Sequence, residues 1–277
     1  KGLEVHELAD PKVTAVQEAY VRKVIDTVGD LDNVLYEISN ENHPPSTMWQ
    51  YHMIEFIHAR EKPRPKQHPV GMTFQYKGGR NRDLFESPAE WISPNPSTDV
   101  PKPYTYRDNP PPADGAKVIL TDTDHLWGIG GDYRWVWKSF LRGLNPIFMD
   151  PYDGEVLGLR HPEKWPALRA AMGHALRLAR RMDLAAMTPR GDLASTGYCL
   201  AKPAKQGAAY LVYLPDGGNV TVDLSAADGR LAAEWIDPKT GEVTRGEAVR
   251  GGAKRTLTAP HKGDAVLYLA APAGSDS

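Results

Sequence analysis

Several short apolar runs of this sequence end in polar side chains that could do chemistry. The run 34–38 is followed within five residues by two amides, a carboxylate and an imidazole, and the run 118–120 by two carboxylates and an imidazole. Runs near residues 74, 93 and 149 also end in polar or aromatic residues. The residues gathered in this way are Asn40, Glu41, His43, Gln75, Tyr76, Asn95, Asp122, Asp124, His125, Trp127 and Tyr152. Carboxyl ends of strands in a parallel barrel meet at one face, so these side chains are expected to share one site.

Two carboxylates across a groove are the groups that hydrolysis of a glycosidic bond requires. One carboxylic acid protonates the leaving oxygen, and the other stabilises or attacks the sugar carbon. Glu41 with either Asp122 or Asp124 is the pair that the strand ends offer. A separation of about 5–5.5 Å gives retention, and about 6.5–9.5 Å gives inversion. Glu37 shares strand parity with Glu41, so we expect it to point into the same interior one layer lower, either in a buried ion pair or as support for the site.

Helix and strand patterns alternate in the first two thirds of the chain. Asp10-Pro11 is typical of an N-cap followed by proline at the first helical position, and Gly29 of a helix end. Helices are predicted over 11–28, 45–60, 132–143 and 162–182, and strands over 34–38, 68–76, 89–96, 117–125 and 145–150. This alternation indicates βαβ units and a parallel sheet.

The pattern changes beyond residue 190. Short segments with alternating apolar positions are separated by the turn sequences "PDGG", "AADG" and "DPKTG". This arrangement predicts an antiparallel β-sandwich. We therefore divide the chain into residues 1–187 and residues 188–277.

Composition argues against other classes of function. The net charge of −2 over 277 residues offers no electrostatic footprint for nucleic acid or an anionic membrane, and no apolar run approaches the ~20 residues of a membrane span. The single cysteine, Cys199, is expected to fill the core. Histidine spacing predicts no metal site, the glycines of 128–132 lack a dinucleotide-binding pattern, and no nucleophile elbow is present. We expect neither metal nor cofactor.

The stretch "YEISNEN" at 36–42 resembles the Asn-Glu signature that ends strand four in the large clan of retaining (β/α)8 glycoside hydrolases. The resemblance implies that Glu41 is the acid/base, that Asn40 touches the sugar 2-hydroxyl, and that the nucleophile ends strand seven. The nucleophile is then expected at Asp122, which is nearer the strand end, or at Asp124. Either residue departs from the glutamate that is usual in the clan.

More narrowly, "DTDHLWGIGGD", "WKSFLRGLNPIFMDPY" and the trailing "EWIDPKTGE" and "DAVLYLA" resemble glycoside hydrolases related to apiosidases, which carry a small β domain after the barrel. The resemblance implies an α/β fold in which a partial (β/α)8 (TIM-type) barrel precedes the β-sandwich. It also implies a carbohydrate substrate, a plant or microbial oligosaccharide or polysaccharide, and a secreted or periplasmic location.

The resemblance begins at strand three or four, with residues 1–8 expected as strand three. A barrel that lacks strands has edges that must be paired or covered. The sequence is then either a fragment or a short form whose edges a second copy covers, and for the short form we expect a homo-oligomer. The alternative is a chain that binds sugar without cleaving it, or that serves a structural role in such an assembly. Glu41 facing Asp122 or Asp124 across an open groove would favour the enzyme.

Overall fold

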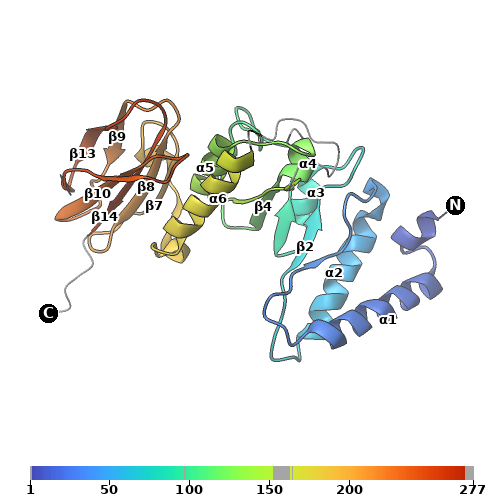
Figure 1. Ribbon diagram of the computed structural model, residues 1–277. Helices are drawn as coiled ribbons and strands as arrows, with labels where there is room; N and C mark the ends of the chain where they lie inside the picture. The colour runs from blue at the N-terminus through green and yellow to red at the C-terminus, as the bar shows by residue number, and fades with distance from the viewer. Residues whose placement is uncertain (1, 97, 152–162, 164, 272–277) are drawn as a thin grey trace.

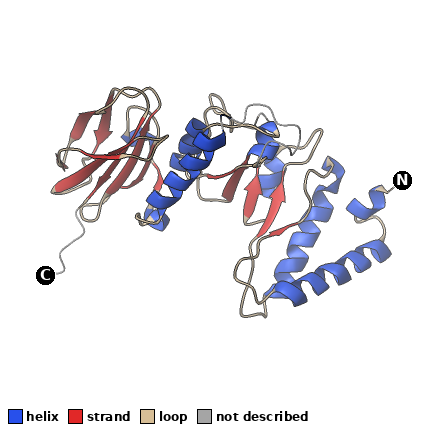
Figure 2. Ribbon diagram, viewed as in Figure 1, coloured by secondary structure: helices blue, strands red, loops and turns tan. Residues whose placement is uncertain are grey.

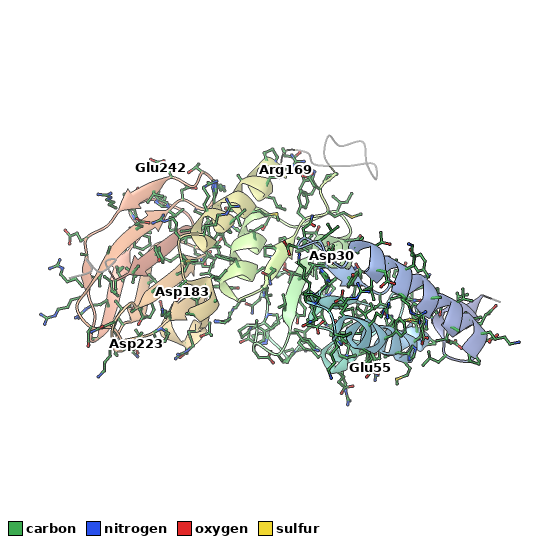
Figure 3. All side chains as sticks on the ribbon, turned by 90° about the horizontal axis from the view of Figure 1, so that it is seen from below. Asp30, Glu55, Arg169, Asp183, Asp223 and Glu242 are labelled. Carbon is green, nitrogen blue, oxygen red and sulfur yellow. The ribbon has the colours of Figure 1, made fainter. Side chains whose placement is uncertain are left out.

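The computed structural model describes residues 2–96, 98–151, 163 and 165–271. Strands dominate one end of the elongated molecule and the helices α1 and α2 the other (Figures 1 and 2). Helices α5 and α6 lie between a parallel sheet and the antiparallel strands. Seen from below, Asp223 and Glu242 mark the β-rich end and Glu55 the helical end (Figure 3).

A parallel sheet of five strands forms the first part, as the alternation of helix and strand predicts. The sheet contains, in order, β1 (Tyr36–Glu37), β2 (Val70–Thr73), β3 (Trp91–Ser93), β4 (Val118–Asp122) and β5 (Asn145–Ile147). The helices of this part are α1 (Pro11–Val28), α2 (Thr47–Glu61), α3 (Asn81–Glu86), α4 (Thr123–Trp127), α5 (Tyr133–Leu141) and α6 (Trp165–Ala179). Within the described residues β1 pairs only with β2, and β5 only with β4, so these five strands form an open sheet.

The N-terminal region confirms one prediction and corrects another. Asp10 caps α1 by accepting a hydrogen bond from the Lys12 amide at 2.9 Å, with Pro11 at the first helical position. The expected strand over residues 1–8 is wrong, because Leu3–His6 form a short 3₁₀ helix. A strand requires a pairing partner for its backbone, whereas here His6 packs its ring 5.3 Å from that of Trp49 on α2.

Antiparallel strands make up the second part, as the turn signals predict. One sheet contains β6 (Thr188–Pro189), β7 (Cys199–Lys202), β8 (Ala209–Leu214), β10 (Arg230–Ile236), β11 (Val243–Arg245), β12 (Val249–Arg250) and β14 (Ala265–Ala270), and β9 (Asn219–Asp223) pairs with β13 (Lys254–Thr258). Val220 and Val222 of β9 share a buried apolar cluster with Val212 of β8 and Leu267 of β14. The two sheets therefore enclose a common core.

A second apolar cluster runs across the junction between the two parts. It joins Trp137 and Leu141 of α5 to Leu211 and Tyr213 of β8. The indole Nε1 of Trp137 donates to the carbonyl of Pro238 at 2.9 Å, between β10 and β11. The junction is therefore a packed interface, which fixes the β-rich part against α5.

A buried polar network supports the amino-terminal ends of β1 and β2. Nδ1 of His68 lies 2.7 Å from Glu61 Oε1, and its Nε2 lies 2.8 Å from the Leu31 carbonyl oxygen. Both ring nitrogens face acceptors, so the ring is best satisfied when both carry hydrogen. The hydrogen bond that the His68 ring donates to Glu61, followed by the one it donates to the Leu31 carbonyl, raises the pKa of His68 above its ordinary value. The hydrogen bond and charge of Glu61 add to the larger effect of burial in raising the pKa of Tyr36 to about 12.

This network makes a pH-dependent contribution to stability. Because the pKa of His68 is higher in the folded chain than in the unfolded one, its contribution is complete below about pH 6.5, the unfolded pKa of histidine. The contribution is lost as the pH rises through the folded pKa. Urea unfolding at several pH values should show this decline in the wild type and a shallower one in His68→Gln. Identical pH profiles would contradict the assignment.

Candidate active site

The carboxyl ends of β1, β2, β3 and β4 surround a hollow of about 480 Å³, here called the strand-end hollow. The residues that line the hollow come from the segments that follow these strands. The lining residues are Glu41, Phe74, Tyr76, Lys77, Gly78, Gly79, Asn95, Thr98, Arg107, Asp124, His125, Leu126, Trp127 and Gly128. The polar strand ends that the sequence presents in succession thus meet at one place.

His125 connects the ends of three strands. Its Nδ1 lies 2.7 Å from the hydroxyl of Ser93, the last residue of β3, and its Nε2 lies 3.1 Å from Oδ1 of Asn40. An amide oxygen only accepts, so Nε2 donates to Asn40, and in the neutral ring Nδ1 accepts from Ser93. In a flat sheet β1 and β4 would lie about 14 Å apart, beyond the reach of these two side chains. The loop after β1 and the helix α4 after β4 therefore converge over the carboxyl edge of the sheet.

Glu41 reaches the hollow from a left-handed backbone conformation. Its φ is 47°, and Lys77, across the same hollow, has a φ of 54°. Residues other than glycine rarely adopt such φ values, and those that do so are concentrated at functional sites. The conformation directs the loop after β1 back over the strand ends.

The two candidate aspartates have different surroundings. Asp124 lines the strand-end hollow together with Glu41. Asp122 does not line it, because its carboxylate caps α4 and accepts a hydrogen bond from the Asp124 amide at 2.9 Å. The structure thus brings Asp124, rather than Asp122, to the same hollow as Glu41.

Three further predicted residues, Tyr76, Asn95 and Trp127, line the hollow. Tyr76 is 54% exposed, with Lys77 Nζ 5.2 Å from the centre of its ring, whereas the Trp127 ring is held edge-on by Trp135 at 5.5 Å. Such aromatic faces suit the apolar side of a sugar ring. Tyr152 lies outside the described residues.

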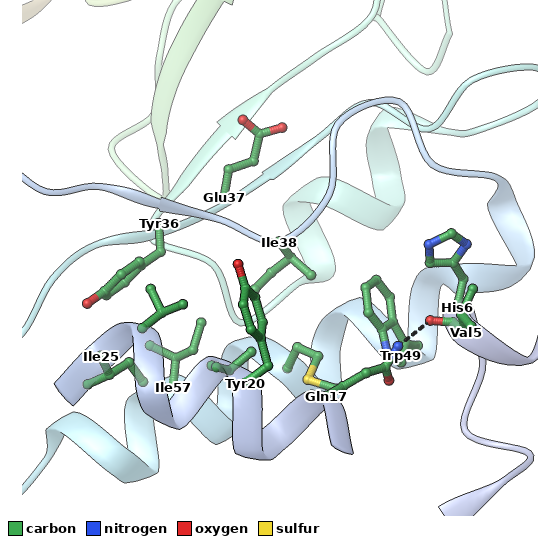
Figure 4. A pocket seen from close by; sticks show the side chains of 13 residues that line it. Val5, His6, Gln17, Tyr20, Ile25, Tyr36, Glu37, Ile38, Trp49 and Ile57 are labelled. Carbon is green, nitrogen blue, oxygen red and sulfur yellow. Dashed lines mark hydrogen bonds between the residues drawn. The ribbon is translucent and has the colours of Figure 1, made fainter. Parts of the chain in front are cut away.

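Other predicted residues lie away from the hollow. Gln75 is buried, and its amide donates to Thr47 at 2.9 Å, so it supports the start of α2. Glu37 lies on the opposite face of β1 from α1 and α2 and accepts from the Thr73 hydroxyl at 2.9 Å (Figure 4). His43 packs against the 3₁₀ turn, with its ring 5.7 Å from that of His6.

Three residues at this site, Arg107, Lys77 and Ser93, were not predicted from the sequence. Arg107 comes from the proline-rich loop before β4, and its guanidinium lies 5.7 Å from the centre of the Trp127 ring. No local pattern marks it, because its place depends on packing between segments far apart in the sequence. Ser93 lies within the predicted strand 89–96 and ends the apolar run that begins at Trp91, so its position in that strand could have identified it.

Metal ligands, membrane spans and nucleophiles were sought in the described part of the chain. There, no group of three His, Cys, Asp or Glu side chains could hold a metal ion, and no helix has the length and apolar character to span a membrane. Cys199 is buried, which raises the pKa of its thiol to about 12. Ser93 is paired with His125 but is only 1% exposed, so it is not accessible to a substrate.

An apolar hollow of about 410 Å³ lies beneath the free edge of β1, among the 3₁₀ helix Leu3–His6, α1 and α2. Tyr36 of β1 and Ile38, the first residue after this strand, point into it, and Ile25 and Ile57 line it from the helices (Figure 4). At its rim Tyr20 is 70% exposed. This edge of the sheet therefore exposes apolar surface, unlike the polar strand-end hollow.

Comparisons with known proteins relate this geometry to a fold. A structure described as "Glycoside hydrolase" superposes with a TM-score of 0.61 at 13% identity, over 93% of this chain and 69% of its own. A glycoside hydrolase family 5 protein from Bacteroides vulgatus superposes with a TM-score of 0.65 at 13% identity, over 93% and 67%. The chain shares the fold of these two glycoside hydrolases.

The β-rich part has a separate match. A family model described as "Putative collagen-binding domain of a collagenase" matches residues 191–270, which contain β7 to β14. No curated protein matches the chain. At 13% identity the structural likeness is one of fold, and activity has to be argued from the site.

Proposed function

We propose that the chain is a retaining glycoside hydrolase, with Glu41 as acid/base and Asp124 as nucleophile. The observation that carries this proposal is that both carboxylates line the strand-end hollow, although they are far apart in the sequence. The shared fold with two glycoside hydrolases supports it. The resemblance to apiosidase-related hydrolases belongs to the same proposal.

In the first step an Asp124 oxygen attacks the anomeric carbon and the glycosidic C–O bond breaks. Glu41 gives its proton to the departing oxygen, which leaves as an alcohol. In the second step water adds to the anomeric carbon, its proton passes to the Glu41 carboxylate, and Asp124 is released. Asn40 does not line the strand-end hollow itself, but its Oδ1 accepts from His125, which does; we assign its remaining amide N–H groups to a sugar hydroxyl.

Turnover of a panel of aryl glycosides and plant oligosaccharides tests the proposal, with the anomer of the first product followed by NMR. We expect hydrolysis with retention for at least one member. Inversion would remove the nucleophile role of Asp124. Absence of hydrolysis across the panel, with binding of sugar, would favour the alternative of a non-catalytic sugar-binding chain.

We also propose that the chain self-associates through the free edge of β1 and the apolar hollow beneath it. Exposed Val16, Tyr20 and Leu35 support this, since apolar surface beside an unpaired strand favours association. Light scattering should give a dimer or larger assembly that Tyr20→Glu dissociates. A clean monomer would overturn this second proposal without affecting the first.

For residues 188–277 we propose a packing role and assign the chemistry to residues 1–187. The family match to residues 191–270 carries collagen binding in its description. The continuous apolar cluster between α5 and β8 favours packing instead.

A further inference from the structure

A larger hollow, of about 780 Å³, adjoins the strand-end hollow, and we call it the α5 hollow. The two share Arg107 and Trp127. The α5 hollow extends over the start of α5 towards Trp165 of α6 and reaches Lys239 in the β-rich part. A chain of sugars bound at the strand-end hollow could thus continue past Trp127 into this second space.

The lining of the α5 hollow carries more positive than negative charge. It contains four cations, Arg107, Arg134, Lys138 and Lys239, and two carboxylates, Asp108 and Asp132. One of those carboxylates is already engaged, because Asp132 caps α5 by accepting from the Trp135 amide at 2.8 Å.

Three of the four cations make their contacts with carbonyl oxygens and rings. Arg107 donates to a carbonyl oxygen, that of Leu126, and Lys138 to that of Asp108 at 2.8 Å. Lys239 Nζ lies 4.9 Å from the centre of the Tyr133 ring. Within the described chain these three form no ion pair with a carboxylate, whereas Arg134 lies 3.7 Å from Asp264. Their charge is therefore available to an anion.

Aromatic side chains complete the lining. Trp127 is held in place by Trp135, and Trp165 is only 4% exposed. The indole Nε1 of Trp165 has no hydrogen-bond partner among the residues that the structure describes. That nitrogen is itself buried, so Trp165 belongs to the packed wall of the hollow, and its N–H is not counted as a ligand contact.

Lys239 is fixed in this position by the packed junction. The carbonyl of Pro238 accepts from Trp137 at 2.9 Å, and that of Lys239 lies 3.1 Å from Nε2 of His174. The turn between β10 and β11 is therefore held against α5 and α6. Through this turn the β-rich part contributes a charge to the hollow.

We propose that the α5 hollow is a subsite for an acidic sugar, carrying a carboxylate or sulfate, of the substrate cleaved at the strand-end hollow. This inference rests on the proposed glycosidase function for the identity of the neighbouring site. Three cations without carboxylate partners in the described chain, together with aromatic side chains, fit an anionic sugar ring. Arg107, at the junction of the two hollows, would lie between the sugar whose glycosidic bond is cleaved and the acidic sugar.

The inference is tested by calorimetry, which measures the binding of matched acidic and neutral oligosaccharides to the full chain. The chain carries Asp124→Asn, which prevents consumption of the ligand. The ligands are tetragalacturonate and its methyl ester, and a chondroitin sulfate hexasaccharide and its desulfated, esterified form. We expect at least one acidic member to bind about tenfold or more tightly than its neutral partner, as one additional ion pair would give. The preferred pair also distinguishes carboxylate from sulfate.

The variants Lys138→Gln and Lys239→Gln, separately and combined, should remove this preference, and Lys239→Arg should retain it. Lys205→Gln is the matched control. Lys205 and Lys239 lie at opposite ends of the same sheet. Lys205 follows Lys202, the last residue of β7, which pairs with Ala209 of β8, whereas Lys239 lies beyond Ile236, at the other end. The control should bind as tightly as the parent chain.

Equal affinity for the acidic and neutral members of both pairs would overturn the inference, as would an unchanged preference in the doubly substituted chain. Hydrolysis of neutral glycosides without any charge preference leaves the glycosidase proposal standing and removes only this subsite. A charge preference in a chain that hydrolyses no glycoside supports the subsite and removes the enzyme.

Discussion

Asp124→Asn is expected to lower the hydrolysis of aryl glycosides by about 10⁴-fold or more, the scale seen when a nucleophile is removed. The amide is nearly the same size as the carboxylate but cannot attack the anomeric carbon. The loss should therefore be the same for good and poor leaving groups. Initial rates with a nitrophenyl and a methyl glycoside of the preferred sugar measure it.

Glu41→Gln should give a different pattern, because an acid is needed only when the leaving oxygen is basic. With a methyl glycoside the rate should fall by about 10²–10⁴-fold, the usual contribution of general acid catalysis. With a dinitrophenyl glycoside the first step should remain fast, so a burst of dinitrophenolate precedes slow turnover. An equal loss on both substrates would remove Glu41 from the acid role.

Asp122→Asn is the matched control for Asp124. Asparagine caps helices about as well as aspartate, so α4 should keep its start and activity should change by less than about tenfold. Circular dichroism should show an unchanged fold in all three variants. If Asp122→Asn abolished turnover while Asp124→Asn did not, the nucleophile would be Asp122.

Trp137→Ala is expected to reduce the free energy of unfolding by about 3–5 kcal/mol, the cost of emptying a large buried aromatic site. The Trp137 side chain is 0% exposed and packs in the cluster that joins α5 to β8. The variant also leaves the Pro238 carbonyl without its indole donor. Such a loss is a large part of the 5–15 kcal/mol that is typical of a folded domain.

Urea unfolding followed by far-UV circular dichroism measures this effect. Trp137→Phe fills most of the volume but lacks the N–H group, so it should cost about 1–3 kcal/mol. Met48→Ala on α2 is the control, since Met48 is 64% exposed and its truncation should change stability by less than about 0.5 kcal/mol. Similar losses for Trp137→Ala and Met48→Ala would show that the junction does not stabilise the chain.

Short sequence patterns predicted those helices and strands whose positions depend on neighbouring residues. The Asp10-Pro11 pair marks the start of α1 because an N-cap and a proline act within one turn. Short apolar runs identified all five parallel strands, since strands buried in such a sheet read as apolar runs. The short helices α3 and α4 were missed, because each lies inside a polar segment that resembles a loop.

The arrangement of the site depends on contacts that no local pattern reports. The bridge from His125 to Asn40 joins residues 85 positions apart, and Arg107 enters from a loop without any motif. The choice between Asp122 and Asp124 shows the same limit. Asp122 ends β4 and Asp124 lies two residues further on, and only the turn into α4 commits Asp122 to capping and brings Asp124 to the hollow.

The unbroken apolar cluster at the junction also constrains protein engineering. Cutting the polypeptide near residue 187 would uncover Leu211 and Tyr213 on one product and Trp137 and Leu141 on the other. Each product would expose apolar surface that the intact chain buries, and transplanting the β-rich segment onto an unrelated enzyme would leave that surface uncovered unless α5 went with it. Fusion partners and affinity tags therefore belong at the termini of this polypeptide rather than at the apparent boundary between its sheets.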